Sequence, residues 1–218
     1  MTMLKRLSVV LLAAGESRRM GELNKLTLPV DGVPLLRRTA MMLSNYGRAE
    51  GCGFAQVVVV TGHKQREAVE QLSGLPTRLA HNSDYTDGQM SSVLCGLRAL
   101  NQPVDGVVIC LSDLPLLDLE DLRAIHQAFT TAEKPILVPT FEGQRGNPIV
   151  LAFEQVEEII STGRNLGCKH LIEREPERVA TLEMPTDHVV VDMDTPDNYK
   201  SVQARIAKKS ITHLVDAV

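Results

Sequence analysis

Short apolar runs alternate with amphipathic stretches along most of the chain. Three of these runs are continuously apolar and rich in β-branched residues: Leu7–Leu12 (LSVVLL), Val57–Val60 (VVVV) and Gly106–Leu111 (GVVICL). Such runs are typical of strands that are buried on both faces, as in a parallel sheet. We predict weaker or shorter strands as well, over Thr77–Ala80, Pro135–Pro139, Asn147–Leu151 and Val189–Met193.

Apolar residues recur with helical spacing between these strands. The expected helices are Pro34–Tyr46, Lys64–Leu72, Gly88–Leu100, Asp118–Thr130, Glu154–Ile160, Cys168–Glu173 and Pro196–Lys208. Strands that alternate with helices predict a Rossmann-like, doubly wound α/β fold, with a mainly parallel sheet and helices on both faces. The 218 residues fit one domain, in which 203–218 is expected to form a loosely packed tail.

The charge and composition exclude several classes of protein. The net charge of −4 does not suggest a nucleic-acid surface, and no apolar run approaches the roughly 18 residues that span a membrane. The four cysteines form no CxxC pair, so that we expect a reducing, cytoplasmic setting. A polyphosphate ligand would need a local cluster of cations, because the overall field is mildly repulsive.

The chemically interesting residues follow the predicted strands. In open α/β sheets, ligands bind beyond the carboxyl ends of the strands. Four such segments carry polar or charged residues: Ala13–Lys25, Thr61–His63, Ser112–Pro115 and Asp192–Thr195. We therefore expect these segments to surround one site, with Thr61 and Ser112 among the residues that bind a nucleotide.

The first of these segments has the composition of a phosphate-binding loop. Gly15 allows the backbone to approach a ligand closely, and successive N–H groups in such a turn can hold phosphate oxygens. Ser17 adds a hydroxyl donor, while Arg19 and Lys25 add cations. The loop is neither a GxGxxG nor a GxxxxGK[ST] motif, and by composition alone it could be a structural turn with solvated arginines.

The string from Leu12 to Lys25, LAAGESRRMGELNK, resembles the LAAG-x-S-x-RMG…K signature of the molybdenum-cofactor nucleotidylyltransferases. The resemblance continues along nearly the whole chain. It implies a Rossmann-like fold, the use of Mg²⁺, and transfer of a nucleoside monophosphate to the phosphate of molybdopterin. It also implies that the loop binds the nucleotide through Leu12, Ala13, Ala14, Gly15, Ser17, Arg19 and Lys25.

Asp113 lies at the end of a predicted strand, in Leu-Ser-Asp-Leu-Pro. A carboxylate there can hold a hard cation, although an isolated Asp-x-Pro is more often a turn or a helix cap. The family carries a similar D-[ML]-P, whose aspartate binds Mg²⁺. Through this resemblance we expect Asp113 to bind the metal and to act in catalysis with Lys25 and Arg19.

Asp192 and Asp194 flank Met193 in a D-x-D-T-P element. If the predicted strand continues through them, a period of two places both carboxylates on one face, where a second metal ligand would fit. The alternative is that Asp194 or Thr195 caps the helix that begins at Pro196. We expect one aspartate to contact the metal, and the pattern leaves open which one.

Asn82, Gly88 and Ser92 belong to a polar segment that precedes a predicted helix. By itself the segment fits a capped helix start, but the family has a similar N…G-x-x-x-S stretch near the base and ribose. These three residues are therefore candidates for nucleotide binding.

Two further segments are expected on the acceptor side. Gly146-Asn147-Pro148 resembles the family's G-[HN]-P, which makes Asn147 a candidate, although a plain turn would look the same. Within 164–170 the family usually has an acidic residue followed by glycine, whereas here Asn165 and Leu166 precede Gly167. Arg164 and Lys169 remain candidates for binding an anionic pterin phosphate.

The expected reaction is attack of an acceptor phosphate on the α-phosphorus of CTP, with pyrophosphate as the leaving group. In the family LAAG goes with cytidylyl transfer and LAGG with guanylyl transfer, so that Ala14 favours CTP over GTP. A molybdoenzyme or its maturation chaperone would be the further partner, and nucleic acids and membranes are not expected partners.

Three rival functions follow from the same residues. A sugar-phosphate nucleotidylyltransferase is the nearest, although those enzymes more often show a Gly-x-Gly-Thr or Gly-x-Gly-Ser loop, whereas here Glu16 stands between Gly15 and Ser17. A cofactor carrier without activity would have lost Lys25 or Asp113, and both are present. An NAD-binding domain is disfavoured because GxGxxG is missing.

Overall fold

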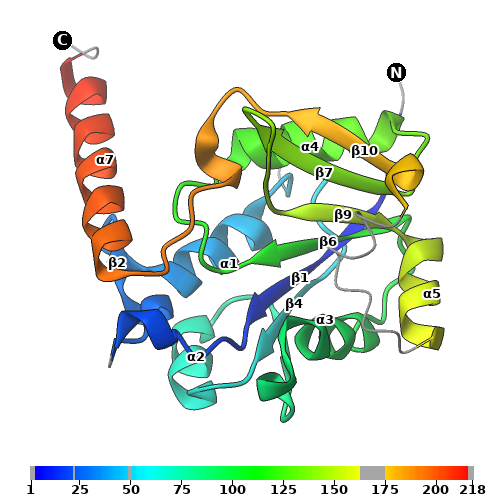
Figure 1. The fold of residues 1–218 in the computed structure, drawn as a ribbon, viewed down its shortest axis with the longest axis horizontal. Coiled ribbons are helices and arrows are strands. Elements are labelled where there is room, and N and C mark those ends of the chain that lie inside the picture. Colours follow the sequence, from blue (N-terminus) through cyan, green and yellow to red (C-terminus); the bar gives the residue numbers. More distant parts are fainter. Residues whose placement is uncertain (1–2, 22, 49–50, 163–174, 216–218) are drawn as a thin grey trace.

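A computed structural model describes residues 3–21, 23–48, 51–162 and 175–215 of the chain, with side chains up to residue 208. One large sheet runs through the middle of the molecule, with helices on both of its faces (Figure 1). The strand order is β10-β7-β9-β6-β1-β4-β5, and β8 pairs with β7. The bounds are β1 Leu7–Ala13, β4 Val57–Thr61, β5 Arg78–His81, β6 Gly106–Leu111, β7 Ile136–Phe141, β8 Gln144–Arg145, β9 Ile149–Ala152 and β10 Val179–Glu183.

Strand β1 lies at the centre of the sheet and is buried along its whole length. It pairs in parallel with β4 on one side and with β6 on the other. Its side chains alternate between the two cores: Leu11 packs in the core that lies over one face of the sheet, and Val10 packs in the other. A continuous apolar run fits this environment because both faces of the strand are covered.

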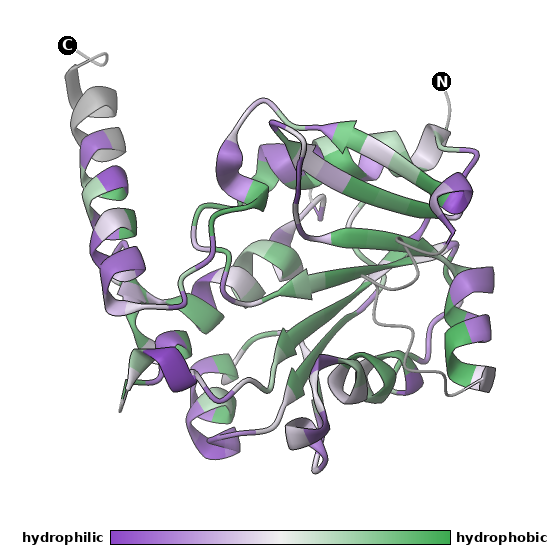
Figure 2. Cartoon of the chain, in the orientation of Figure 1, coloured by the Kyte–Doolittle hydropathy of each residue, from purple (hydrophilic) through white to green (hydrophobic). Residues whose placement is uncertain are grey.

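Helices α1 (Leu35–Asn45), α2 (Gln65–Leu72) and α4 (Leu119–Thr131) cover one face, and α3 (Gln89–Arg98) and α5 (Phe153–Thr162) cover the other. The hydrophobic colour in Figure 2 follows the strands and the inner sides of these helices. Strand β9 runs antiparallel to both of its neighbours, β6 and β7. The mainly parallel, Rossmann-like fold expected from the sequence is therefore confirmed, with β9 as an antiparallel insertion.

A separate hairpin of β2 (Pro29–Val30) and β3 (Val33–Pro34) lies beside the last helix, α7 (Pro196–Val215). Val30 and Leu35 form a small apolar cluster with Met193 and Val202. Helix α7 continues seven residues beyond the predicted end at Lys208, so that much of the tail expected to be loosely packed is helical. Within the described residues, no helix has both the length and the hydrophobicity needed to cross a bilayer.

The strand predicted over Val189–Met193 is wrong. This segment begins in a 3-10 turn, η5 (Asp187–Val189), and continues without regular structure. Val189 and Met193 are buried, but they belong to different apolar clusters. The last strand is instead β10, an edge strand in which only Val179 is buried, so that it lacks the continuous apolar run by which the inner strands were predicted. The helix predicted over Cys168–Glu173 lies outside the described residues.

Candidate active site

The loop after β1 is held by backbone contacts and by one buried side chain. The N–H of His63 donates to the carbonyl of Ala14 at 3.2 Å, which ties the start of the loop to the end of β4. Ser17 has a left-handed conformation with φ of 54°, and a short 3-10 turn, η1 (Arg18–Met20), follows it. Met20 is buried and anchors this turn. The exposed Gly15 and the arginines of the turn are thus presented on a fixed support.

A second 3-10 turn, η2 (Lys25–Thr27), presents Lys25 to two carboxylates. The Lys25 Nζ atom lies 2.6 Å from Asp113 Oδ2 and 2.6 Å from Asp194 Oδ1. The guanidinium of Arg19 forms a further ion pair with Asp194. Three segments that are distant in the sequence therefore meet in one charge cluster, which we call the Lys25 cluster (Arg19, Lys25, Asp113, Asp194).

Asp113 and Asp194 meet because the backbone joins their segments. The N–H of Met193 donates to the carbonyl of Asp113 at 3.0 Å, just beyond the end of β6. The cap of α7 is Thr195, whose hydroxyl accepts from the N–H of Asn198 at 3.1 Å. The carboxylate of Asp194 is therefore not used as the cap and turns to Lys25.

The charges of the cluster shift the pKa values of its members. Burial lowers the pKa of the Lys25 ammonium, but attraction by Asp113 and Asp194 more than offsets it, so that the pKa is raised. Burial acts to raise the pKa of Asp194, whereas Lys25 and Arg19 lower it, and the result is a lowered value. The pKa of Asp192 is raised by partial desolvation of its carboxylate, which is otherwise exposed, and by the negative charges of Asp194 and Asp113. Lys25 thus stays cationic while it separates two carboxylates.

One carboxylate oxygen of the cluster has no hydrogen-bond partner among the described residues. Asp113 Oδ1 is buried and makes no hydrogen bond in the described part of the chain. The hydroxyl of Ser17, in the phosphate-type loop, is also buried and without a partner among these residues. Buried polar atoms are normally paired, so that unpaired ones at a cleft indicate positions for a ligand.

Two adjoining pockets open beside the Lys25 cluster. The main pocket has a volume of about 270 Å³ and is lined by Leu12, Ala14, Gly15, Glu16, Lys25, Leu26, Tyr85, Gly88, Gln89, Ser92, Leu111, Ser112 and Asp113. The side pocket has a volume of about 250 Å³ and is lined by Glu16, Ser17, Arg18, Arg19, Lys25 and Asp194. Glu16 and Lys25 line both, so the cation-rich space continues into a more apolar one. This combination suits a nucleotide, which has a charged and a flat apolar end.

Some predicted residues lie near this site without lining either pocket. Thr61 is buried in the sheet, and its hydroxyl donates to the carbonyl of Ala80 at 3.4 Å. The Nδ2 atom of Asn82 donates to the hydroxyls of Ser91 and Ser92, at 2.8 and 3.0 Å. Asn82 therefore organises the loop that carries Ser92.

The remaining candidates fall into three groups. Ala13 is buried at the end of β1, and Asp192 is exposed beside the Lys25 cluster. Asn147 is half-buried, and its N–H donates to the carbonyl of Val189 at 2.9 Å. Arg164 and Lys169 lie outside the described residues.

Five residues of the main pocket were not predicted as site residues: Glu16, Leu26, Tyr85, Gln89 and Leu111. Tyr85 lies in the polar segment between β5 and α3, and Gln89 is the first residue of α3. The signal that could have indicated these residues is their position in the sequence beside predicted ones, such as Gln89 beside Gly88.

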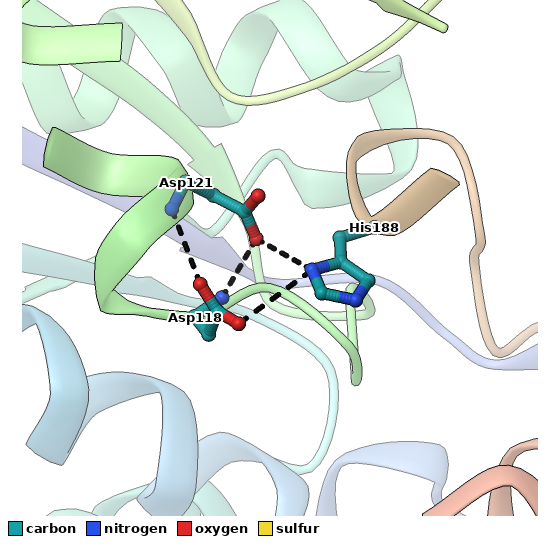
Figure 3. A group of neighbouring side chains, drawn as sticks. All are labelled: Asp118, Asp121 and His188. Carbon is teal, nitrogen blue, oxygen red and sulfur yellow. Dashed lines mark hydrogen bonds and ion pairs between the residues drawn. The ribbon is translucent and has the colours of Figure 1, made fainter. Parts of the chain in front are cut away.

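A second acidic group, Asp118, Asp121 and His188, has the residue types of a metal site (Figure 3). Its potential ligand atoms lie within 4.8 Å of one another. However, Asp118 and Asp121 form the capping box of α4, and His188 Nδ1 lies 2.9 Å from Asp121 Oδ2. The group is explained as a helix cap that also binds the η5 turn.

The mainly parallel sheet, the cation-rich loop after β1 and the carboxylates around Lys25 form a site that suits a nucleoside triphosphate. The family model of the MobA-like NTP transferase domain matches residues 9–196. The chain belongs to this family of nucleotidyltransferases.

Relatives with different names share this domain. The chain is 30% identical over 204 residues to the purine catabolism protein PucB of Bacillus subtilis, covering 89% of this chain and 94% of PucB. It is 25% identical over 201 residues to the "probable molybdenum cofactor guanylyltransferase" of Natronomonas pharaonis, covering 89% and 88%. It is also 33% identical over 171 residues to the bifunctional protein GlmU of Clavibacter sepedonicus, covering 73% of this chain but only 34% of GlmU.

Solved structures show the same fold. A nucleotidyl transferase from Methanothermobacter thermautotroptrophicus superposes with a TM-score of 0.77 at 21% identity, covering 94% of this chain and 99% of that one. Rv0371c of Mycobacterium tuberculosis, solved in complex with manganese, superposes with a TM-score of 0.72 at 21% identity, covering 91% and 98%.

Proposed function

We propose that this nucleotidyltransferase transfers CMP from CTP to the phosphate of a molybdopterin-type acceptor and releases pyrophosphate. The observation that carries the proposal is the position of Lys25, which lies between two carboxylates where the side pocket meets the main pocket. The triphosphate occupies the side pocket, and the nucleoside occupies the main pocket. Residues 1–218 act as one catalytic unit.

The carboxylates fit a hard divalent cation, for which we propose Mg²⁺. Asp113 offers a buried oxygen without a partner in the described part of the protein, and Asp192 and Asp194 offer further oxygens nearby. Oxygen ligands of this kind are those that Mg²⁺ prefers. When bound, the cation neutralises phosphate charge and aligns the oxygens for an in-line displacement. The manganese complex of a structural neighbour is consistent with a divalent cation in this fold.

The protein's own part in the reaction is positioning and neutralisation of charge. Two anions must approach each other, and no covalent intermediate with the protein is needed. Lys25 and Arg19 bind the phosphates, while the amides that follow Gly15 and the hydroxyl of Ser17 donate to phosphate oxygens. The raised pKa of Lys25 keeps it cationic, so that it acts as an electrostatic group and not as a base.

The direct test is pyrophosphate release with each nucleoside triphosphate, with and without Mg²⁺ and molybdenum cofactor. We expect release with CTP only when Mg²⁺ and the acceptor are both present. Lys25→Ala and Asp113→Ala should each lower turnover about 10²–10³-fold, the effect of losing one preorganised electrostatic contact. Full turnover in either variant would contradict the assignment.

The choice of CTP rests on Ala14, which lines the main pocket. Ala14→Gly should raise kcat/KM for GTP relative to CTP, because the space beside the base becomes larger. An unchanged ratio would remove Ala14 as a determinant. The guanylyltransferase relative makes GTP the first alternative donor.

A second candidate function is nucleotidyl transfer to a sugar phosphate, the nearest rival function that the sequence allows. Release of pyrophosphate with sugar phosphates but not with the molybdenum cofactor would favour it.

A further inference from the structure

We infer that Asn24 and Glu67 form a positioning pair that holds Lys25 in its place between the carboxylates. The inference rests on the proposed role of Lys25 in binding the triphosphate. Neither Asn24 nor Glu67 lines the two pockets. They act through the η2 turn, at whose first position Lys25 lies.

Asn24 fixes the backbone of this turn by capping it. Its side-chain oxygen accepts from the N–H of Leu26 at 3.1 Å, as in an N-cap. Its carbonyl accepts from both the N–H and the hydroxyl of Thr27, each at 3.0 Å. A three-residue turn has few hydrogen bonds of its own, so this residue supplies much of what defines it.

Glu67 ties the capped turn to the body of the protein. Asn24 Nδ2 donates to Glu67 Oε2 at 2.8 Å. Glu67 lies in the first turn of α2, a helix that is anchored by the buried Ala68 and Leu72. On the other side of Lys25, the side chain of Leu26 is buried in the same core. Lys25 is therefore held in place by both of its neighbours in the sequence, Asn24 and Leu26.

This support matters because lysine has a long, flexible side chain. Its ammonium must lie within hydrogen-bonding distance of two carboxylates, and later of the phosphates. A displacement of about 1 Å in such a group can lower a rate about 100-fold. Catalytic groups are commonly held in place by hydrogen bonds from residues that never touch the substrate.

Exchange of the hydrogen-bonding groups gives the sharpest test. Asn24→Asp keeps the acceptor for Leu26 but places a second carboxylate against Glu67. The double variant N24D/E67Q restores a donor and an acceptor at this contact. We expect turnover to fall about 10-fold to 100-fold in N24D and to recover most of this loss in N24D/E67Q. Melting temperatures measured in parallel should show all variants folded.

Alanine variants provide the matched comparison. N24A and E67A should each lower kcat. The loss of kcat in the double variant should be smaller than the product of the two single losses, because both substitutions remove the same contact. Glu70 lies one turn further along α2 and is paired with the exposed Arg66 at 3.1 Å, so that E70A is the control and should keep full turnover. Full activity in E67A, or no recovery in N24D/E67Q, would overturn the inference.

A readout without turnover separates this inference from the proposed function. Lys25 is mostly buried in its ion pairs and should react slowly with an amine-specific acylating reagent. Mass spectrometry should show faster labelling of Lys25 in N24D and wild-type-like labelling in N24D/E67Q. If no nucleotide gives pyrophosphate but the labelling follows this pattern, the proposed function fails and the positioning pair stands. If CTP is turned over but N24D has the labelling rate and kcat of the wild type, the positioning pair is refuted and the proposed function stands.

Discussion

The Lys25 cluster has an unusual consequence for nucleotide binding. The cations that we expect to meet the triphosphate are already paired with the carboxylates that we expect to hold the metal. Without a divalent cation, a triphosphate must compete with these carboxylates for Lys25 and also approach their negative charge. Asp194→Asn removes one of the charges and keeps the shape of the side chain. It should therefore strengthen nucleotide binding in the absence of metal, although it removes a proposed metal ligand.

The size of the effect follows from the contact that is lost. Lys25 Nζ and Asp194 Oδ1 are 2.6 Å apart, and both side chains are only 12% exposed. A hydrogen bond between charged groups contributes about 1.5–3 kcal/mol, which corresponds to about a 10-fold to 100-fold change in affinity. Arg19 is 70% exposed, so its pair with Asp194 adds little.

The assay is calorimetric titration of CTP in the presence of EDTA, for the wild-type protein and for D194N. The control is D197N, which removes the same charge from an exposed residue three positions away that pairs with Lys200 at the surface. We expect tighter metal-free binding in D194N alone and, with Mg²⁺, turnover lower by about 10²–10³-fold. Metal-free affinity that is unchanged or weaker in D194N would refute the reasoning.

Two further predictions concern the stability of the fold. Gly96→Ala should lower the free energy of unfolding by about 1–3 kcal/mol, because a Cβ on α3 would lie 2.8 Å from Val60 Cγ2 and would also collide with Val10. Denaturant titration measures this loss, with Arg98→Ala at an exposed position of the same helix as the control. An equal loss of stability in G96A and R98A would contradict the prediction. The pKa of His126 is lowered from 6.5 by burial, so the folded protein binds its proton less readily than the unfolded chain and stability should fall as the pH drops below about 6.5. His126→Gln should flatten the stability profile below that pH, and a slope equal to that of wild type would exclude His126 as its cause.

The sequence predicted the central strands well because their environment is simple. Leu7–Leu12 is buried on both faces, and a continuous apolar run of this kind is typical of a central strand in a parallel sheet. The direction of β9 could not be predicted, since its residues Ile149–Leu151 are as buried as those of a parallel strand. The segment Val189–Met193 is also rich in valine and for that reason was predicted as a strand. Its buried side chains, Val189 and Met193, belong to two separate apolar clusters.

The site was predicted in outline because the loop with Lys25 follows β1 and Asp113 follows β6, whereas Asp194 reaches the site from a segment that is not a strand. Lys25, Asp113 and Asp194 come together in the structure, as expected for residues that surround one cleft. Thr61 and Asn82 lie near the two pockets, yet their side chains form hydrogen bonds with Ala80 and Ser91 and line neither pocket. Their roles as ligands stay predictions, since strand-end position alone does not tell a group that binds a ligand from one that supports a loop.

Lys25 is 88 residues from Asp113 and 169 residues from Asp194 along the chain. Its two ion pairs therefore join three segments, and the pair with Asp194 can form only after a further 169 residues have been made. During synthesis, the arginine-rich loop leaves the ribosome long before the acidic segment that neutralises it. In the nascent chain, Arg19 and Lys25 thus lack the Asp194 carboxylate that pairs with both of them in the folded protein, until that segment has been made.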